Sequence, residues 1–404
     1  MAEIRPFTAL RPPAELAPRV ASPPYDVVST KEARALAEGN SVSFLHVTRP
    51  EIGLPDGTDE HADEVYAAAR KNLETMVEEQ WLLRDAEPVL YLYAQRMGEH
   101  VQVGVVGCAS VAEYDSDRIK KHEKTRADKE DDRTRHISEI AAHDEPVFLT
   151  YRAVPAIDAL VASAQIQKPV YDFVAPDGVG HTFWALGRDT SREIARAFTA
   201  VPCLYVADGH HRSAAASRVH RERRGDGGEH DVFLAVVFPH DQMQILAYNR
   251  VVRDLEGRSA EALLAALGGV LELEKTSAPA PDAPKSFGIY CGGQWYRARV
   301  RAGSFDAADP VASLDCSICQ DQILGPIFGV TDPRRDAHVD FVGGIRGHRE
   351  LERRVDTGEM SVGIHLYPTS VGELIAVSDA GRLMPPKSTW FEPKLRSGLF
   401  VHPF

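Results

Sequence analysis

The chain has 404 residues, of which 44% are hydrophobic and 26% charged, and its formal net charge at pH 7 is −13. This composition is typical of a globular protein large enough for two subdomains, and no hydrophobic run reaches the length of a membrane span. The acidic balance argues against broad binding to nucleic acid or acidic membranes. The first residues lack the hydrophobic core of a secretory signal, so we expect a cytoplasmic protein.

Five cysteines are spread through the sequence. Their odd number and low density argue against a disulfide framework and fit the cytoplasm. Cys316 and Cys319 have the spacing of a redox or metal pair, but residues 311–324 have the pattern of a helix and no second pair accompanies them. We therefore favour two small hydrophobic residues on a half-buried helix.

The N-terminal 28 residues contain six prolines and are expected to be extended and irregular. Two of these prolines directly precede Tyr25 and Asp26. A stiff segment of this kind either fixes Tyr25 and Asp26 at the edge of a substrate pocket or forms a plain turn.

The next elements are a short helix, a strand, a long amphipathic helix and a two-stranded hairpin. Their expected bounds are Lys31 to Glu38, Ser41 to Val47, His61 to Trp81, and 87–107.

A charged segment follows the hairpin and precedes a polar helix expected over residues 128–142. It contains His122, Glu123, Lys124 and Thr125. Glu123 lies between basic residues that would hold its charge, as a general base requires. The alternative is a solvated charged loop.

The centre of the sequence is the stretch from Val201 to Ser213, which follows a helix ending near Phe198. Leu204 to Ala207 has the pattern of a buried strand, Asp208 and Gly209 form a tight turn, and a helix starts near His211. The free amides and the dipole of a helix start bind anions, and basic side chains gather there. The sequence thus predicts a phosphate site, most plausibly for a nucleotide, from Asp208, Gly209, His210, His211, Arg212 and Ser213.

The alternative is a polar helix start with Asp208 as its N-cap and solvated histidines. A metal site is disfavoured here, because adjacent histidines point in different directions and the i, i+4 spacing is missing.

Beyond the central helix we expect a flexible linker at 223–228 and a hairpin formed by Asp231 to Phe238 and Met243 to Tyr248. A proline-rich connector at 276–284 is the expected boundary between an N-terminal region, 1–275, and a C-terminal region, 285–404.

Near its C-terminus the chain has a tail in which prolines alternate with cationic and hydroxyl residues. Lys387, Ser388, Thr389 and Lys394 offer groups suited to a phosphate or a carboxylate, and the first three are candidate substrate-binding residues. The alternative is a proline-stiffened tail packed by Trp390 and Phe391.

The segment from Val206 to Arg212, with the sequence VADGHHR, resembles the signature of an uncharacterised domain-of-unknown-function family of bacterial and archaeal proteins. It is also similar to the phosphate loop of the ParB/sulfiredoxin superfamily and, within it, of the free-serine kinases. The resemblance implies an α+β fold with a ParB/sulfiredoxin-like core. Sulfiredoxins have a reactive cysteine where this chain has His210, so redox chemistry of that kind is disfavoured.

The resemblance further implies a small-molecule kinase that uses ATP or ADP with Mg²⁺, and free L-serine as the acceptor. Glu123 would be the catalytic base, His210 or His211 would stabilise the transferred phosphoryl group, and His122, Lys124 and Thr125 would contact substrate. The common P-loop and protein-kinase signatures are missing. Two alternatives stay open: a ParB-like nucleotide-binding switch without kinase activity, and a metal-dependent hydrolase built on the histidines and Glu123.

Overall fold

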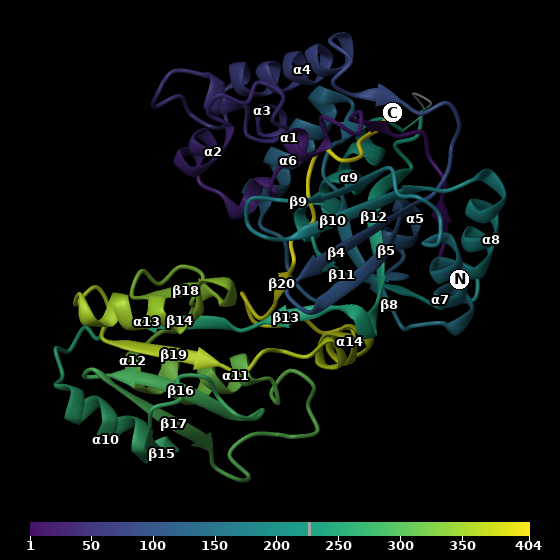
Figure 1. The fold of residues 1–404 in the computed structure, drawn as a ribbon. Coiled ribbons are helices and arrows are strands. Elements are labelled where there is room, and N and C mark those ends of the chain that lie inside the picture. Colours follow the sequence, from purple (N-terminus) through teal and green to yellow (C-terminus); the bar gives the residue numbers. More distant parts are fainter. Residues whose placement is uncertain (225–227) are drawn as a thin grey trace. The chain divides into compact units, whose positions relative to one another are not determined.

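The computed structural model describes residues 1–224 and 228–404 and divides into two compact units. Unit 1 comprises Met1–Met243 and Pro393–Phe404, and unit 2 comprises Gln244–Glu392. Both units combine helices and strands, so the mixed α/β class expected from the sequence is confirmed (Figure 1). Of the helices in the described ranges, none combines the length and hydrophobicity that a bilayer crossing requires.

Unit 1 is built on a mixed sheet with the strand order β6-β11-β8-β12-β5-β4-β10-β9, to which β1 adds on β5. Strands β11 and β6 are parallel neighbours, and so are β12 and β8, whereas the other pairs are antiparallel. The strands of unit 1 are β1 (Ile4–Arg5), β2 (Leu10–Arg11), β3 (Leu83–Arg84), β4 (Tyr91–Met97), β5 (His100–Ser110), β6 (Ile119–Lys120), β7 (Ala142–His143), β8 (Val147–Tyr151), β9 (Tyr171–Val174), β10 (Gly180–Ala185), β11 (Leu204–Asp208), β12 (Val232–Pro239) and β21 (His402–Pro403).

The helices of unit 1 are α1 (Ala17–Val20), η1 (Tyr25–Val27), α2 (Thr30–Ala37), α3 (Leu45–Thr48), η2 (Pro50–Gly53), α4 (Asp63–Glu78), α5 (Val111–Asp115), α6 (Ala127–Ile140), α7 (Pro155–Ala164), α8 (Arg188–Phe198), α9 (His210–Glu222) and η3 (His240–Gln242). The sequence predicted α2, α4, α6, α8 and α9 to within a few residues.

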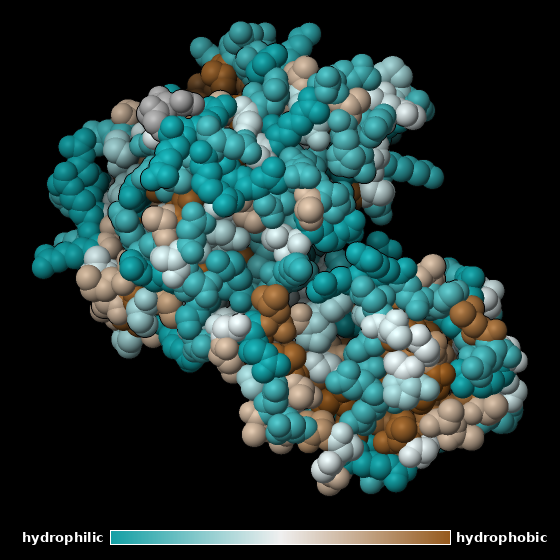
Figure 2. Space-filling view, turned by 180° about the vertical axis from the view of Figure 1, so that it is seen from behind, coloured by the Kyte–Doolittle hydropathy of each residue, from teal (hydrophilic) through white to brown (hydrophobic). Residues whose placement is uncertain are grey.

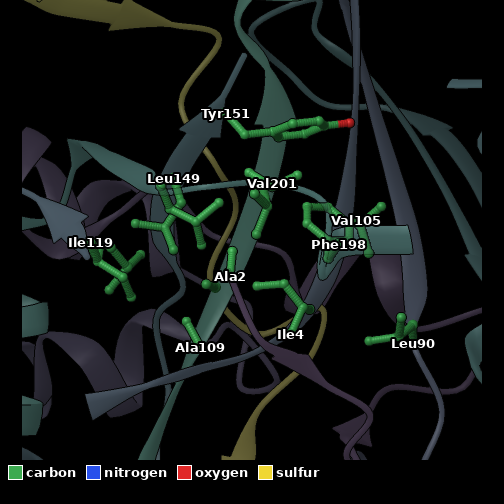
Figure 3. Packing of buried hydrophobic residues seen from close by; sticks show 14 of the residues in the cluster. Ala2, Ile4, Leu90, Val105, Ala109, Ile119, Leu149, Tyr151, Phe198 and Val201 are labelled. Carbon is green, nitrogen blue, oxygen red and sulfur yellow. The ribbon is translucent and has the colours of Figure 1, made fainter. Parts of the chain in front are cut away.

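The main hydrophobic core lies on one face of this sheet (Figure 3). Alternate residues of β8, such as Leu149 and Tyr151, contribute to it together with Ile157 of α7 and Phe198 of α8. Every residue of β8 and β12 is buried, so these strands are covered on both faces. The sheet therefore gives a rigid base to the segments that leave its ends.

The C-terminal segment of unit 1 packs with aromatic residues of the sheet. Phe400 is 5.5 Å from Phe183 and 5.8 Å from Tyr93, measured between ring centroids. The last residues add the short strand β21, which pairs with β7. This return of the chain places Lys394 and Ser397 in unit 1.

Unit 2 contains a six-stranded sheet with the order β15-β17-β16-β19-β14-β18 and the separate pair β13-β20. Its elements are β13 (Gln244–Leu246), β14 (Tyr248–Val252), α10 (Ala260–Val270), β15 (Leu271–Thr276), β16 (Ser286–Cys291), β17 (Gln294–Val300), α11 (Asp315–Cys319), η4 (Gln320–Leu324), α12 (Gly325–Phe328), β18 (Val339–Gly343), η5 (Gly344–Arg346), α13 (Gly347–Asp356), β19 (Val362–Leu366), α14 (Val371–Asp379) and β20 (Trp390–Glu392). Cys316 and Cys319 are buried free thiols on α11, as the helix interpretation requires.

The proline-rich connector at 276–284 does not separate the two units. It joins β15 to β16 inside unit 2, and both strands pair with β17 in the same sheet. The chain passes between the units after Met243 and again before Pro393. A surface loop and a linker between domains have the same composition, so proline content alone could not distinguish them.

One predicted strand and one predicted strand pairing were wrong, and one expectation is only partly described. Residues 41–47 form turns and the start of α3 instead of a strand. The hairpin expected from 231–238 and 243–248 does not form, because β12 pairs with β5 and β8 while β13 pairs with β20. Of the linker expected at 223–228, residues 225–227 lie outside the described ranges.

The visible surface is mostly hydrophilic, with small separate groups of hydrophobic residues (Figure 2). Exposed large hydrophobic side chains such as Ile166, Val174 and Leu255 come from different elements. Scattered residues of this kind are ordinary on globular proteins and mark no docking surface by themselves.

Candidate functional site

Two parallel strands bring the central stretch and the charged segment together. β6 and β11 pair in parallel, with Ile119 opposite Leu204 and Lys120 opposite Tyr205. The charged segment follows β6, and the glycine turn follows β11. Because the carboxyl ends of parallel neighbours meet at one edge of a sheet, the two motifs become adjacent despite their separation in sequence.

The turn between β11 and α9 requires glycine. Gly209 has φ 91° and ψ 30°, and a Cβ there would lie 3.1 Å from the guanidinium carbon of Arg212. Gly209 is itself the N-cap of α9, and the Oδ1 of Asp208 accepts its N–H at 2.8 Å. The first bond of the helix runs from the Ser213 N–H to the Gly209 carbonyl, so the preceding amides have no intrahelical acceptor.

His122, Glu123 and His210 form a compact group at this corner. One ligand atom from each residue lies within 4.8 Å of the others, and the two imidazole rings meet edge to face at a centroid distance of 4.4 Å. His122 is 1% exposed and His210 is 6% exposed. The carboxylate expected to act as base thus lies beside the histidine expected at the phosphate loop.

Both buried histidines are held in the neutral form. Burial lowers the pKa of His122 to about 4, although Asp208 and the Val206 carbonyl favour its protonated form. Burial, followed by the neighbouring His122, lowers the pKa of His210 well below its usual value. At neutral pH each ring therefore has one nitrogen lone pair available for a proton or a metal ion.

Asp208 is an anion held by two cations. Burial by itself would raise the pKa of Asp208, but Lys394 and Arg212 outweigh it and keep the pKa below its usual value. The Nζ of Lys394 lies 2.8 Å from the Oδ2 of Asp208. The chain thus contributes a lysine from its C-terminal segment to the end of β11.

Arg212 lies inside the protein, with 7% of its surface exposed. Its Nη1 donates to the carbonyl of Pro146. Burial disfavours the charged guanidinium, but Asp26, Glu145 and Asp208 outweigh this effect and hold its pKa above the usual value. The guanidinium is therefore first of all a counter-ion for neighbouring carboxylates, of which Glu145 is buried.

Tyr25 and Asp26 reach this carboxylate cluster through the short helix η1. The Tyr25 N–H donates to Oε1 of Glu145 at 2.9 Å, and the guanidinium of Arg133 lies 4.0 Å from the centre of the Tyr25 ring. Tyr25 and Arg133 also line a small pocket of about 20 Å³. The segment thus forms a short helical turn, and a role of Tyr25 and Asp26 in substrate binding stays a prediction.

The remaining residues of the two motifs have structural contacts. The Nε2 of His211 accepts the N–H of Arg126 at 3.1 Å, which ties the start of α9 to the start of α6. The Thr125 hydroxyl donates to Glu130, and the buried Ser213 hydroxyl donates to the His210 carbonyl. Lys124 is exposed. Of these residues, His211 most directly connects the two motifs.

Lys387, Ser388 and Thr389 belong to unit 2. The Ser388 hydroxyl donates to the Pro385 carbonyl at 2.6 Å and lies 3.1 Å from the sulfur of Cys316. The backbone carbonyl of Lys387 accepts from Arg250. These contacts organise the turn before β20, and a role of the three residues in substrate binding stays a prediction.

Sequence reasoning missed Glu145 and Arg133. Glu145 is 5% exposed and accepts bonds from the Tyr25 amide and the Ser397 hydroxyl, and burial raises the pKa of its carboxyl. An acidic pair directly before the buried strand β8 was the available signal. No comparable signal marked Arg133, which lies within a polar helix.

Comparisons with known proteins were made for the whole chain. The search of curated proteins gave no match. Among solved structures, a conserved hypothetical protein from Pyrococcus furiosus is 12% identical with a TM-score of 0.36, covering 74% of this chain and 95% of its own. A free serine kinase in complex with AMP is 12% identical with a TM-score of 0.36, covering 73% and 91%. SbnI with a C-terminal truncation from Staphylococcus aureus is 13% identical with a TM-score of 0.36, covering 71% and 82%.

A family model matches residues 4–317. This range includes both motifs and the strands β6 and β11 that bring them together. This match confirms the family membership that the VADGHHR segment indicated. The chain belongs to the family described as Protein of unknown function (DUF1015).

Proposed function

We propose that the protein is a phosphotransferase that moves a phosphoryl group from a nucleotide to the hydroxyl of a small acceptor. The observation that carries the proposal is that Glu123 lies close to His210 at the turn of Asp208 and Gly209, the glycine corner. A base for the acceptor and a helix start suited to phosphate then lie at one place. The resemblance of this corner to those of free-serine kinases makes free L-serine the first acceptor to test.

The chain's own residues would divide the work as follows. The amides at the start of α9, where the helix dipole favours anions, would hold the phosphates. Lys394 and the buried Arg212 would add positive potential, while Asp208 keeps Lys394 in place. Glu123 would take the proton of the attacking hydroxyl as its oxygen bonds to phosphorus, and the electron pair of the broken P–O bond stays with the departing nucleotide.

A bound nucleotide would supply the phosphoryl group, and a divalent ion such as Mg²⁺ would neutralise charge on it. The glycine corner fits a phosphate because Gly209 has no side chain. A Cβ at position 209 would occupy the space next to the guanidinium of Arg212. Tyr25 and Asp26 would border the acceptor, since both lie close enough to Arg212 to influence its pKa.

The test is a coupled assay of purified protein with ATP, ADP or pyrophosphate against a panel of amino acids and polyols. Glu123→Gln should lower kcat by about 10²- to 10⁴-fold while nucleotide affinity stays within a few-fold. Glu78→Gln, an exposed glutamate on α4, is the matched control. Unchanged turnover in Glu123→Gln would remove the assigned base, and tight nucleotide binding with no acceptor turned over would favour a binding switch.

A metal-dependent hydrolase is the second candidate. It is favoured by the two neutral, buried imidazoles of His122 and His210 beside the carboxylate of Glu123. Hydrolysis of an ester or phosphoester without an added acceptor would distinguish it from transfer.

A further inference from the structure

The cluster of His122, Glu123 and His210 has a property that the phosphotransferase proposal does not use. Three buried ring nitrogens have no hydrogen-bond partner within the described residues. They are both nitrogens of His122 and the Nε2 of His210. A buried polar atom without a partner is destabilising, so proteins rarely keep one without a ligand for it. Three such atoms beside one carboxylate indicate that something binds there.

The frame around these side chains is fixed. His210 is the first residue of α9, directly after a glycine held at positive φ. The segment that carries Glu123 is tied to the same corner by the bond from the Arg126 N–H to His211. His122 follows β6, whose pairing with β11 sets its position relative to His210. The three side chains are thus presented by rigid backbone rather than by an independent loop.

The chemistry of the three groups selects the ligand. Two neutral imidazoles and one carboxylate are the donors of zinc, manganese, iron(II) and cobalt sites, whereas Mg²⁺ prefers oxygen donors only.

We propose that His122, the carboxylate of Glu123 and the Nε2 of His210 bind one first-row transition-metal dication. Three protein ligands leave coordination positions open to water or to a substrate oxygen, as in catalytic rather than structural sites. The proposal does not require phosphoryl transfer. A carboxylate that binds the ion through one oxygen keeps the other for a proton, so Glu123 can serve both purposes.

The distances set one condition on this site. Two ligand atoms bonded to the same ion at about 2.1 Å can be no more than about 4.2 Å apart. The three ligand atoms lie within 4.8 Å of one another, so a pair at that limit would have to approach by about 0.6 Å for opposite positions on the ion and by about 1.4 Å for a tetrahedral site. Glu123 is only half-buried, so rotation of its side chain can bring the carboxylate closer to the imidazoles.

The experiment measures metal directly, with no nucleotide present. Untagged protein is loaded with Zn²⁺, Mn²⁺ or Co²⁺, gel-filtered, and examined by inductively coupled plasma mass spectrometry, thermal unfolding and, for Co²⁺, visible absorption. We expect about one ion per chain, a rise in Tm on loading, and d–d bands of a site with nitrogen and oxygen ligands. His210→Gln and Glu123→Gln should each weaken binding by at least about 100-fold, beyond the effect of an outer-shell change. His220→Gln is the matched control, because His220 lies in the last turn of the same helix and contacts His230, and it should keep the metal.

The proposal is overturned if loaded wild-type protein holds no more metal than His210→Gln, or if Glu123→Gln binds as tightly as wild type. Chelation of the wild-type protein, followed by reloading, tests the site even if a variant fails to fold: Tm has to fall and recover. Failure of the kinase assay leaves these metal measurements unaffected, so the two proposals fail separately.

Discussion

Replacing Arg212 by methionine tests whether this arginine is mainly an internal counter-ion. The variant removes a buried cation and keeps most of the side-chain volume. The buried Glu145 would then lose a neighbouring cation, Asp208 would keep only Lys394, and the Pro146 carbonyl would lose its donor. Removing one partner of a buried ion pair costs about 3–5 kcal/mol, because the remaining charge stays buried.

The expected deficit in Tm follows from the size of the unit. For a body of about 150–250 residues each kcal/mol shifts Tm by about 2–4 °C, so Arg212→Met should lower the Tm of unit 1 by roughly 6–20 °C at pH 7. Arg218→Met, on the same helix but with a side chain 30% exposed, removes an ion pair with Asp131 and should cost less than about 1 kcal/mol.

The pH dependence separates loss of charge from loss of packing. In the wild type the pKa of Asp208 is lowered, so its stabilising contribution is present above the unfolded value and is lost as pH falls. Burial already raises the pKa of Glu145, and Arg212 is the first charge that opposes this, so without Arg212 the destabilising effect of an ionised Glu145 grows as pH rises. The deficit of Arg212→Met should therefore be smaller at pH 5 than at pH 7.

Thermal and urea unfolding, followed by hydrogen exchange of peptides from unit 1, measure these differences. Adding Glu145→Gln should restore part of the stability, because it removes one of the uncompensated carboxylates. A variant Arg212→Met that unfolds within about 1 kcal/mol of wild type at pH 7, or with the same deficit at both pH values, would refute the reasoning. Arg212 would then be available to a ligand.

Three further predictions concern single positions in unit 1. Gly209→Ala should lower the free energy of unfolding in urea by about 1–3 kcal/mol, because φ is 91° and the new Cβ would contact Arg212. The control is Gly187→Ala at the N-cap of α8, where φ is −68° and the space around the new Cβ is open, and this variant should not be destabilised. Burial lowers the pKa of His143 to about 3, so its contribution to stability is present above about pH 6.5 and is lost as pH falls. His143→Gln should therefore reduce the loss of unfolding free energy between pH 7 and pH 5 by about 2 kcal/mol. An equal loss in the variant and the wild type would contradict this. Ala141 ends α6 with φ 49°, so Ala141→Gly should raise Tm slightly, by about 0.5–1 kcal/mol of stability, and a lower Tm would show that its side-chain contacts matter more.

Local chemistry made the central corner predictable. A hydrophobic run, an Asp-Gly turn and a series of helix formers fix β11 and α9 through contacts between residues close in sequence. The helices α4 and α6 were predictable for the same reason, because their periodicity lies within one segment. Residues 41–47 were predicted wrongly because a short hydrophobic run fits a strand and a buried helical turn equally well.

Other features depended on pairing over long distances. The parallel contact of β12 with β8 and the return of the chain at Pro393 have no local signal, so the hairpin and the domain boundary were misplaced. The proximity of Glu123 to His210 was expected only from a resemblance between motifs. Its physical reason, the parallel pairing of β6 with β11, is a property of the folded sheet.

The sequence by itself determined which residues could do chemistry here: a glycine corner, basic and imidazole side chains at a helix start, and an isolated glutamate in a charged segment. The tertiary structure decided which of those residues are neighbours in space. It turned Arg212 inward to three carboxylates, joined His122 to His210, and brought Glu145 and Lys394 to the same edge. Charge, burial and ligand geometry depend on neighbours in space, and those neighbours come from strands and segments far apart in the chain.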